Sequence, residues 1–208
     1  MEQLDYSNQA AWTRISGDKQ SPIALSDTLA VEINFETILS FNYKHLANYV
    51  RDTGAGIEVG LEGTASIGNR PFRLKQFHIH TPSEHTVNDI SYDAEIHFVH
   101  EASDGRLAVV AILVQSGNAS QTYDAVLAHM DKTEHFEIPI DDIMPVSKAY
   151  YHYIGSLTTP PLTENVEWYV LKQPVTLSVE QLNHLKTFYS HNNRDLQALN
   201  GRPIISSN

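Results

Sequence analysis

The chain has 208 residues, of which 41% are hydrophobic, and this length and composition fit one ordinary domain with its own core. An excess of 25 acidic over 14 basic side chains gives a formal charge of -11, which argues against a nucleic-acid or anionic-membrane surface as the partner. There are no cysteines, so disulfides, thiolate metal sites and cysteine nucleophiles are excluded, and any metal must be held by His, Asp or Glu.

The beginning of the sequence shows no targeting signal. The segment from Met1 to Trp12 lacks a basic stretch followed by an apolar run of signal-peptide length. No window approaches the roughly 20 apolar residues that a membrane span needs. We therefore expect a cytoplasmic protein outside the membrane, although removal of a signal peptide would leave the same sequence.

Turn residues recur at short intervals, and most runs between them are short and rich in Val, Ile, Phe and Tyr. The turn signals are Gly54 to Gly56, Gly68-Asn69, Asn88-Asp89, Asp104-Gly105 and Pro160-Pro161. This pattern predicts a mainly β protein, with strands at Phe72 to His80, Ala94 to Glu101 and Leu107 to Gln115. The third strand is apolar almost throughout, so we expect it to be buried on both faces in the middle of a sheet.

Two peripheral helices are predicted beside the sheet. The first covers Ser120 to Met130, and the second starts at Ser178, where Ser178 and Gln181 can form a capping box. The second helix has an apolar stripe of Val179, Leu182, Leu185 and Phe188 or Tyr189. No repeat, low-complexity tract or linker-like change in composition interrupts the chain, so we expect a single domain over residues 1–208.

A histidine pattern on two of the predicted strands indicates a metal site. Strand alternation places His78 and His80 on one face, while Phe77 and Ile79 point into the opposite layer. A neighbouring strand can supply His97 from the same face. Three neutral imidazoles at roughly 2.0–2.1 Å leave a fourth tetrahedral position open, which is the arrangement of a catalytic zinc site.

A His-x-His pair by itself is more often solvated or hydrogen-bonded than metal-bound, so the third histidine carries the hypothesis. Gln76 and Glu95 strengthen it, because they precede His78 and His97 by two positions on the same strand faces. Both can accept a hydrogen bond from the second ring nitrogen of a zinc-binding imidazole.

Two further histidines have a different interpretation. His100 lies on the strand face opposite His97, and His85 lies in the turn after the His-x-His strand. We interpret both as structural histidines with satisfied hydrogen bonds.

Several separated segments resemble the signature segments of α-class carbonic anhydrases, and they occur in the family's order. They are Gln20-Ser21-Pro22-Ile23, Gln76-Phe77-His78-Ile79-His80, Pro82-Ser83-Glu84-His85, Glu95-Ile96-His97 and Tyr153-Ile154-Gly155-Ser156-Leu157-Thr158-Thr159-Pro160-Pro161. The resemblance extends from Tyr6 and Trp12 through Trp168 to Asn193-Arg194 and Gln197, which is nearly the whole chain. The sequence is similar to a bacterial-type member without cysteines.

The resemblance implies a central, twisted, mostly antiparallel sheet with a few peripheral helices and a cleft that reaches a zinc ion. It implies reversible hydration of carbon dioxide to bicarbonate and a proton by zinc-hydroxide attack, with weak esterase activity and inhibition by sulfonamides. His78, His80 and His97 look like the zinc ligands, with Gln76 and Glu95 behind them.

The resemblance also assigns roles around the metal. Thr158 looks like the hydroxyl that accepts the zinc-hydroxide proton, and Glu84 looks like the acceptor that orients Thr158. An ionised Glu84 has no proton to donate, so Thr158 would donate to Glu84 and accept from the zinc hydroxide. Thr159 and Tyr6 look like polar contacts of the solvent network. The apolar wall of the carbon dioxide pocket looks like Val99, Val109, Leu157, Val166 and Trp168, although each of these taken alone would be read as ordinary core.

The sequence departs from fast family members at the proton-shuttle position. Where they carry a histidine, the best register over Asp52 to Ile57 places Ala55, which cannot carry a proton. His45 is the nearest upstream histidine, but a solvated loop histidine is the default interpretation. The chain also lacks the disulfide of many secreted relatives, so stability must come from the core or from association, and a homodimer stays open.

Two other classes of function compete with this one. Some relatives keep the fold, lose a zinc histidine and act as binding modules, but all three histidines remain here. Another kind of zinc hydrolase is the second alternative, and the sequence lacks the helical His-Glu-x-x-His pattern that would support it.

Overall fold

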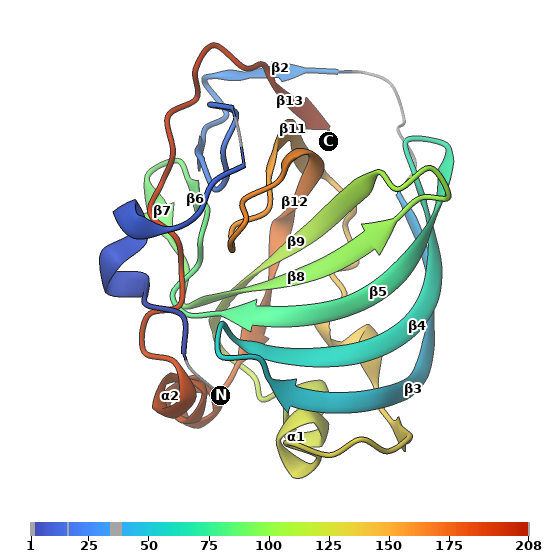
Figure 1. Cartoon of the computed structure of the whole chain (residues 1–208). Coiled ribbons are helices and arrows are strands. Elements are labelled where there is room, and N and C mark those ends of the chain that lie inside the picture. The colour runs from blue at the N-terminus through green and yellow to red at the C-terminus, as the bar shows by residue number, and fades with distance from the viewer. Residues whose placement is uncertain (1–2, 16, 34–38, 208) are drawn as a thin grey trace.

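The central feature of the computed structural model, which describes residues 3–15, 17–33 and 39–207, is a twisted sheet of ten strands (Figure 1). The strands of the structure are β1 (Ala24–Leu25), β2 (Ala30–Glu32), β3 (Ser40–Asp52), β4 (Ile57–Ile67), β5 (Arg70–His80), β6 (Thr86–Val87), β7 (Ile90–Ser91), β8 (Ala94–Glu101), β9 (Leu107–Ser116), β10 (Phe136–Glu137), β11 (Tyr150–Ser156), β12 (Glu164–Leu177) and β13 (Ile204–Ser207). The large sheet has the order β10-β3-β4-β5-β8-β9-β12-β11-β13-β2, and β1, β6 and β7 form a separate small sheet. Within the large sheet only the β9–β12 and β13–β2 pairs of the described strands are parallel. The predicted mainly β, mostly antiparallel fold is confirmed.

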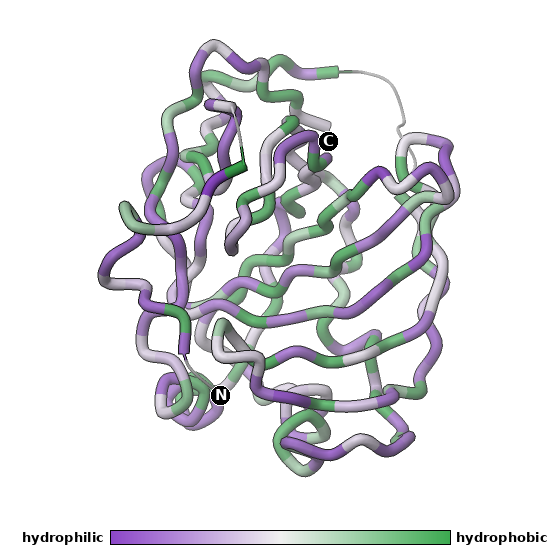
Figure 2. The backbone as a smooth tube through the Cα atoms, viewed as in Figure 1, coloured by the Kyte–Doolittle hydropathy of each residue, from purple (hydrophilic) through white to green (hydrophobic). Residues whose placement is uncertain are grey.

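The three predicted strands correspond to β5, β8 and β9, and they lie side by side in the middle of the sheet. On β9, Val110 and Ile112 belong to one apolar cluster, while Val109 and Ala111 belong to the other. The strand is therefore buried on both faces, as its continuous apolar run predicts. Strand β4, which pairs with β5 on the side away from β8, instead alternates hydrophobic and hydrophilic residues along much of its length (Figure 2).

Both predicted helices are present at the periphery of the sheet (Figure 1). Helix α1 (Gln121–Ala128) begins after Ser120, and α2 (Val179–Phe188) begins after Ser178, whose capping box with Gln181 is formed. Two 3-10 helices, η1 (Tyr6–Ala11) and η2 (Ile140–Ile143), complete the regular elements of the described chain. None of the described helices combines the length and the hydropathy needed to cross a membrane.

Two apolar clusters lie on opposite faces of the sheet. The larger one includes Phe77, Ile79 and Phe98 and extends to α1 through Tyr123 and Val126. The smaller one lies on the other face of β9 and β12. His78 and His80 alternate with Phe77 and Ile79 along β5, so they project on the face opposite the larger cluster.

His100 is a buried structural histidine, as the sequence predicts. Its side chain lies in the larger core, with 0% exposure, and its Nδ1–H donates to the main-chain oxygen of Ala108 at 3.3 Å. The hydroxyl of Tyr43 lies 2.7 Å from Nε2 and donates to it. Burial lowers the pKa of His100 to about 4, because a charged imidazolium would lose its hydration there.

This lowered pKa predicts a loss of stability in mild acid. The unfolded chain binds a proton at His100 near pH 6.5, whereas the folded chain does so only near pH 4, so stability falls as pH decreases between these values. The free energy of unfolding should lose on the order of 2 kcal/mol from this residue between pH 7 and pH 5. His100→Gln keeps a polar partner for Tyr43 and does not titrate. Urea unfolding at both pH values should show a smaller acid loss in the variant, and equal losses would contradict the assignment.

Candidate metal centre

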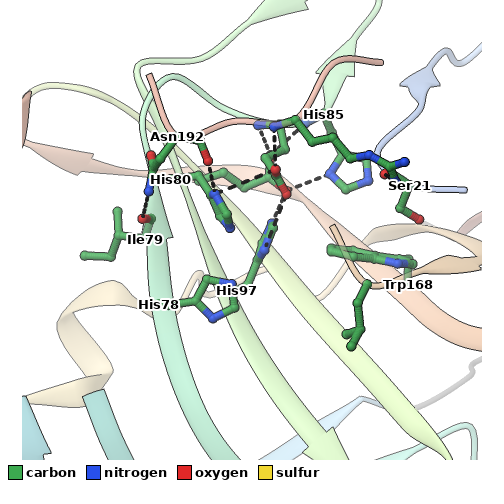
Figure 3. Close-up of polar contacts among 12 residues, drawn as sticks. Ser21, His78, Ile79, His80, His85, His97, Trp168 and Asn192 are labelled. Atoms are coloured by element: carbon green, nitrogen blue, oxygen red, sulfur yellow. Dashed lines mark hydrogen bonds and ion pairs between the residues drawn. The ribbon is translucent and has the colours of Figure 1, made fainter. Parts of the chain in front are cut away.

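The antiparallel pairing of β5 and β8 brings three histidines together. His97 lies directly opposite His78, and Glu95 lies opposite His80. The ring centroids are 5.0 Å apart for His78 and His80, 5.2 Å for His78 and His97, and 4.6 Å for His80 and His97. One nitrogen from each ring lies within 4.8 Å of the other two. The structure therefore gathers the predicted ligand set at one point, as Figure 3 shows.

The hydrogen bonds of His78 and His80 fix which nitrogen faces that point. The Nδ1–H of His78 donates to Gln76 Oε1 at 2.9 Å. The Nδ1–H of His80 donates to the main-chain oxygen of Asn192 at 2.7 Å. In a neutral imidazole only one nitrogen carries a proton, so Nε2 of each ring keeps a free lone pair.

His97 uses the opposite nitrogen. Its Nε2–H donates to Glu95 Oε1 at 2.8 Å, which leaves the lone pair on Nδ1. Both residues are buried, with exposures of 1% and 0%. The lone pairs available for a metal therefore belong to Nε2, Nε2 and Nδ1 of His78, His80 and His97, respectively.

An unpaired nitrogen shows that these residues fit a metal ion. Nε2 of His80 is fully buried and has no hydrogen-bond partner among the described residues. Such a group is costly unless a ligand satisfies it. Burial lowers the pKa of His78 well below its ordinary value, and burial also lowers the pKa of His80. Both rings are therefore neutral at neutral pH, which is the form that binds zinc.

A second cluster of His85, Glu95 and His97 has ligand atoms equally close together, but it is already satisfied. Glu95 Oε1 accepts from His97 and from His85 Nδ1 at 2.7 Å, and Oε2 accepts from the main-chain N–H groups of Glu84 and His85. Burial alone would raise the pKa of Glu95, but its contacts with His85 and His97 hold the pKa well below the ordinary value. This cluster supports the metal ligands and is not a second metal site.

The hydrogen bond predicted from Thr158 to Glu84 is not formed in the structure. Glu84 Oε1 accepts from the main-chain N–H of Arg194 at 2.7 Å, which turns the carboxylate toward the histidines. The other oxygen, Oε2, lies 3.9 Å from His97 Nδ1 and has no hydrogen-bond partner in the described chain. Thr158 is buried, with 5% exposure. Glu84 thus leaves one buried carboxylate oxygen beside His97 unsatisfied within the described chain.

The five predicted wall residues gather in the smaller apolar cluster. Its buried members include Val109, Val166 and Trp168, and Val99 and Leu157 pack against them. The ring of Trp168 lies 4.9 Å from the ring of His97, so the cluster reaches the histidines.

The predicted shuttle position lies in the loop between β3 and β4. The main-chain oxygen of Ala55 accepts from the Tyr6 hydroxyl and from Asn192 Nδ2, each at 3.0 Å. Because Asn192 also binds His80, this loop is tied to the metal centre. His45 lies elsewhere, on β3, with its side chain 57% exposed and 3.4 Å from Asp141 of η2. Thr159, the other predicted solvent contact, is half-buried in the loop after β11.

Sequence reasoning missed the residues that hold the site from outside the sheet. Asn192 binds the Nδ1–H of His80 with its main chain, and its side chain accepts from Thr81 N–H at 2.7 Å and donates to Ile79 O at 3.1 Å. Arg194 supplies the N–H for Glu84. The Asn193-Arg194 match was the only signal near these residues, and nothing in a single sequence places that segment against β5.

The sequence comparisons point to one family. A model of the eukaryotic-type carbonic anhydrase family matches residues 6–208. The chain is 35% identical over 199 residues to a carbonic anhydrase of Pectobacterium atrosepticum, covering 91% of this chain and 80% of that protein. It is 34% identical over 206 residues to a carbonic anhydrase of Klebsiella pneumoniae, covering 95% of this chain and 84% of that protein.

A solved structure of a carbonic anhydrase is also similar to this chain. The α-carbonic anhydrase of Thermovibrio ammonificans, in complex with the inhibitor sulfanilamide, is similar with a TM-score of 0.84 and 35% sequence identity. The similarity covers 91% of this chain and 87% of that chain.

Replacing one ligand tests the histidine cluster directly. His97→Ala removes one of three lone pairs, so zinc affinity should fall by more than the roughly 10–100-fold typical of losing a residue behind a ligand. The matched control is His184→Ala, because His184 is exposed on α2. Elemental analysis after dialysis against a chelator should find zinc in the wild type and the control. Zinc retained at one equivalent by His97→Ala would remove His97 from the ligand set.

Proposed function

This chain belongs to the eukaryotic-type, or α-class, carbonic anhydrase family, and we propose that it hydrates carbon dioxide reversibly with a zinc ion held by His78, His80 and His97. The observation that carries the proposal is the buried Nε2 of His80, which has no partner among the described residues, beside two further free imidazole lone pairs. Zinc held there would lower the pKa of its bound water to about 7, the known value for carbonic anhydrase, and supply a nucleophile at neutral pH.

The ligand set is well suited to this role because it carries no negative charge. His78 and His80 donate to the neutral acceptors Gln76 and Asn192, and only His97 donates to a carboxylate. The positive charge of the metal would therefore stay largely uncompensated by its direct ligands.

Glu84 and Thr158 would set the direction of the hydrogen bonds at the open position. Glu84 Oε2, which has no partner among the described residues, can only accept when it is ionised, and the Thr158 hydroxyl would be its donor. A Thr158 hydroxyl that donates its one proton to Glu84 can only accept from the group bound at the open metal position. A contact with Thr158 would satisfy the buried Glu84 Oε2.

The apolar wall would receive the substrate. Carbon dioxide is linear and carries no charge, so its site needs a dry surface more than hydrogen-bond donors. Val109, Val166 and Trp168 supply such a surface next to His97. Bicarbonate is charged, and the same apolar surface gives it little to bind, which favours its release.

Stopped-flow measurement of carbon dioxide hydration tests the proposal. We expect activity in the zinc-loaded protein, loss of activity with a chelator, and recovery when zinc is added back. Sulfanilamide should inhibit by competing for the open metal position, as the similarity to the Thermovibrio ammonificans structure suggests. The same preparation should show only weak hydrolysis of activated esters. A zinc-loaded protein without hydration activity would contradict the proposal.

Ala55 predicts that export of the proton limits turnover. No imidazole with a pKa near 6.5 stands at this position, so each proton must leave through solvent and buffer. In weak buffer the wild type should show a low kcat that rises with added imidazole, whereas kcat/KM should barely respond. Ala55→His should raise kcat in weak buffer and leave kcat/KM nearly unchanged.

His45→Ala is the control for this prediction, because His45 faces Asp141 and should have no part in proton transfer. A large loss of kcat in that variant would show that another shuttle operates. A kcat that responds neither to Ala55→His nor to buffer would show that proton export is not limiting.

A further inference from the structure

A line of buried polar groups runs from His97 away from the metal centre (Figure 3). Its first member is Glu95, whose Oε1 is shared by the imidazoles of His97 and His85. Its Oε2 accepts two main-chain N–H groups, so the carboxylate has no free position. The orientation of Glu95, and with it that of His97, therefore depends on where the His85 ring lies.

His85 is held at both of its ring nitrogens. Nδ1 donates to Glu95 Oε1 at 2.7 Å, and Nε2 lies 2.8 Å from the hydroxyl of Tyr153. The ring has 0% exposure and packs against Trp168 with centroids 4.9 Å apart. No water can replace either partner at such a site, so a lost contact would leave a buried nitrogen unpaired.

Tyr153 is anchored in turn by Ser21. Its hydroxyl lies 2.8 Å from Ser21 Oγ, and Ser21 Oγ accepts from the N–H of Ser156 at 3.0 Å. Burial raises the pKa of Tyr153 well above its ordinary value, so the hydroxyl keeps its proton. Ser21 and Ser156 are both fully buried.

Gly155 leaves room for the side chains of Ser21 and Tyr153 to meet. A Cβ atom at that position would lie 2.0 Å from Ser21 Oγ and 2.8 Å from Cε2 of Tyr153. Any other residue there would displace one of the two side chains. The contact between Tyr153 and Ser21 therefore requires a residue without a side chain at position 155.

We propose that Tyr153 is a positioning residue for the metal centre, holding His85 and through it Glu95 against His97. This inference rests on the proposed zinc site. Without the Tyr153 hydroxyl, His85 Nε2 loses its buried partner, and the ring must rotate or change tautomer to recover one. Either change weakens the shared contact at Glu95 Oε1, and His97 is then less firmly oriented toward the metal.

The test compares two tyrosines of the same strand. Tyr153→Phe removes only the hydroxyl from this line of contacts. Tyr151→Phe is the matched control, because Tyr151 is equally buried on the same face of β11 and its hydroxyl donates to Asp27 instead. Zinc dissociation constants are measured by chelator competition on folded protein. We expect Tyr153→Phe to weaken zinc binding about tenfold and Tyr151→Phe to stay within about twofold of the wild type.

A double-mutant cycle shows whether Tyr153 acts through Glu95. In a Glu95→Gln background, Tyr153→Phe should weaken zinc binding much less than in the wild type, since the contact it supports is already altered. Fully additive effects would overturn the proposal. Ser21→Ala removes the far anchor without changing the apolar packing, and it should weaken zinc binding by roughly threefold. This variant also serves if Tyr153→Phe does not fold.

The outcomes separate this inference from the proposed function. If the wild type binds zinc and hydrates carbon dioxide but Tyr153→Phe matches Tyr151→Phe, only the positioning role is wrong. If the wild type itself binds no zinc, the proposed function fails with it.

Discussion

The register between β5 and β8 is the constraint on which the metal centre depends. His78 can meet His97 only because the two strands pair with these residues opposite each other. On the reverse face the same register pairs Phe77 with Phe98, both fully buried and with ring centroids 5.2 Å apart. A slip of one residue would move the aromatic rings to the metal face and the histidines into the core. Packing on one face thus holds the chemistry on the other.

Strand pairing alone would leave the imidazoles free to rotate and to exchange tautomers. Their orientation comes from three acceptors of different origin. Gln76 and Glu95 lie two residues before the histidines they serve, so strand geometry supplies them directly. Asn192 comes from the segment after α2, 112 residues along the chain from His80. The site is therefore complete only when the C-terminal part of the chain has docked on the sheet.

Several residues that hold the metal centre in place lie in segments without regular secondary structure. Asn192 and Arg194 lie outside helices and strands, and so does Ser21, yet all three are buried. Arg194 donates its side chain to the main-chain oxygen of Ser21 at 2.7 Å and its main-chain N–H to Glu84. Buried backbone without regular pairing must find such partners. The metal centre and the packing of these two segments consequently depend on the same hydrogen bonds.

The sequence by itself determined the strands β5, β8 and β9, the capped start of α2, and the face on which His78, His80 and His97 meet. These features are local, because alternation, turn residues and capping depend on neighbours a few positions apart. Only the tertiary structure decided which groups from distant segments stand behind the ligands. It also decided that Glu84 accepts from the N–H of Arg194, while its other oxygen has no partner in the part of the chain that the structure describes. Such contacts join residues more than a hundred positions apart, and no periodic pattern within one sequence records which segments will pack together.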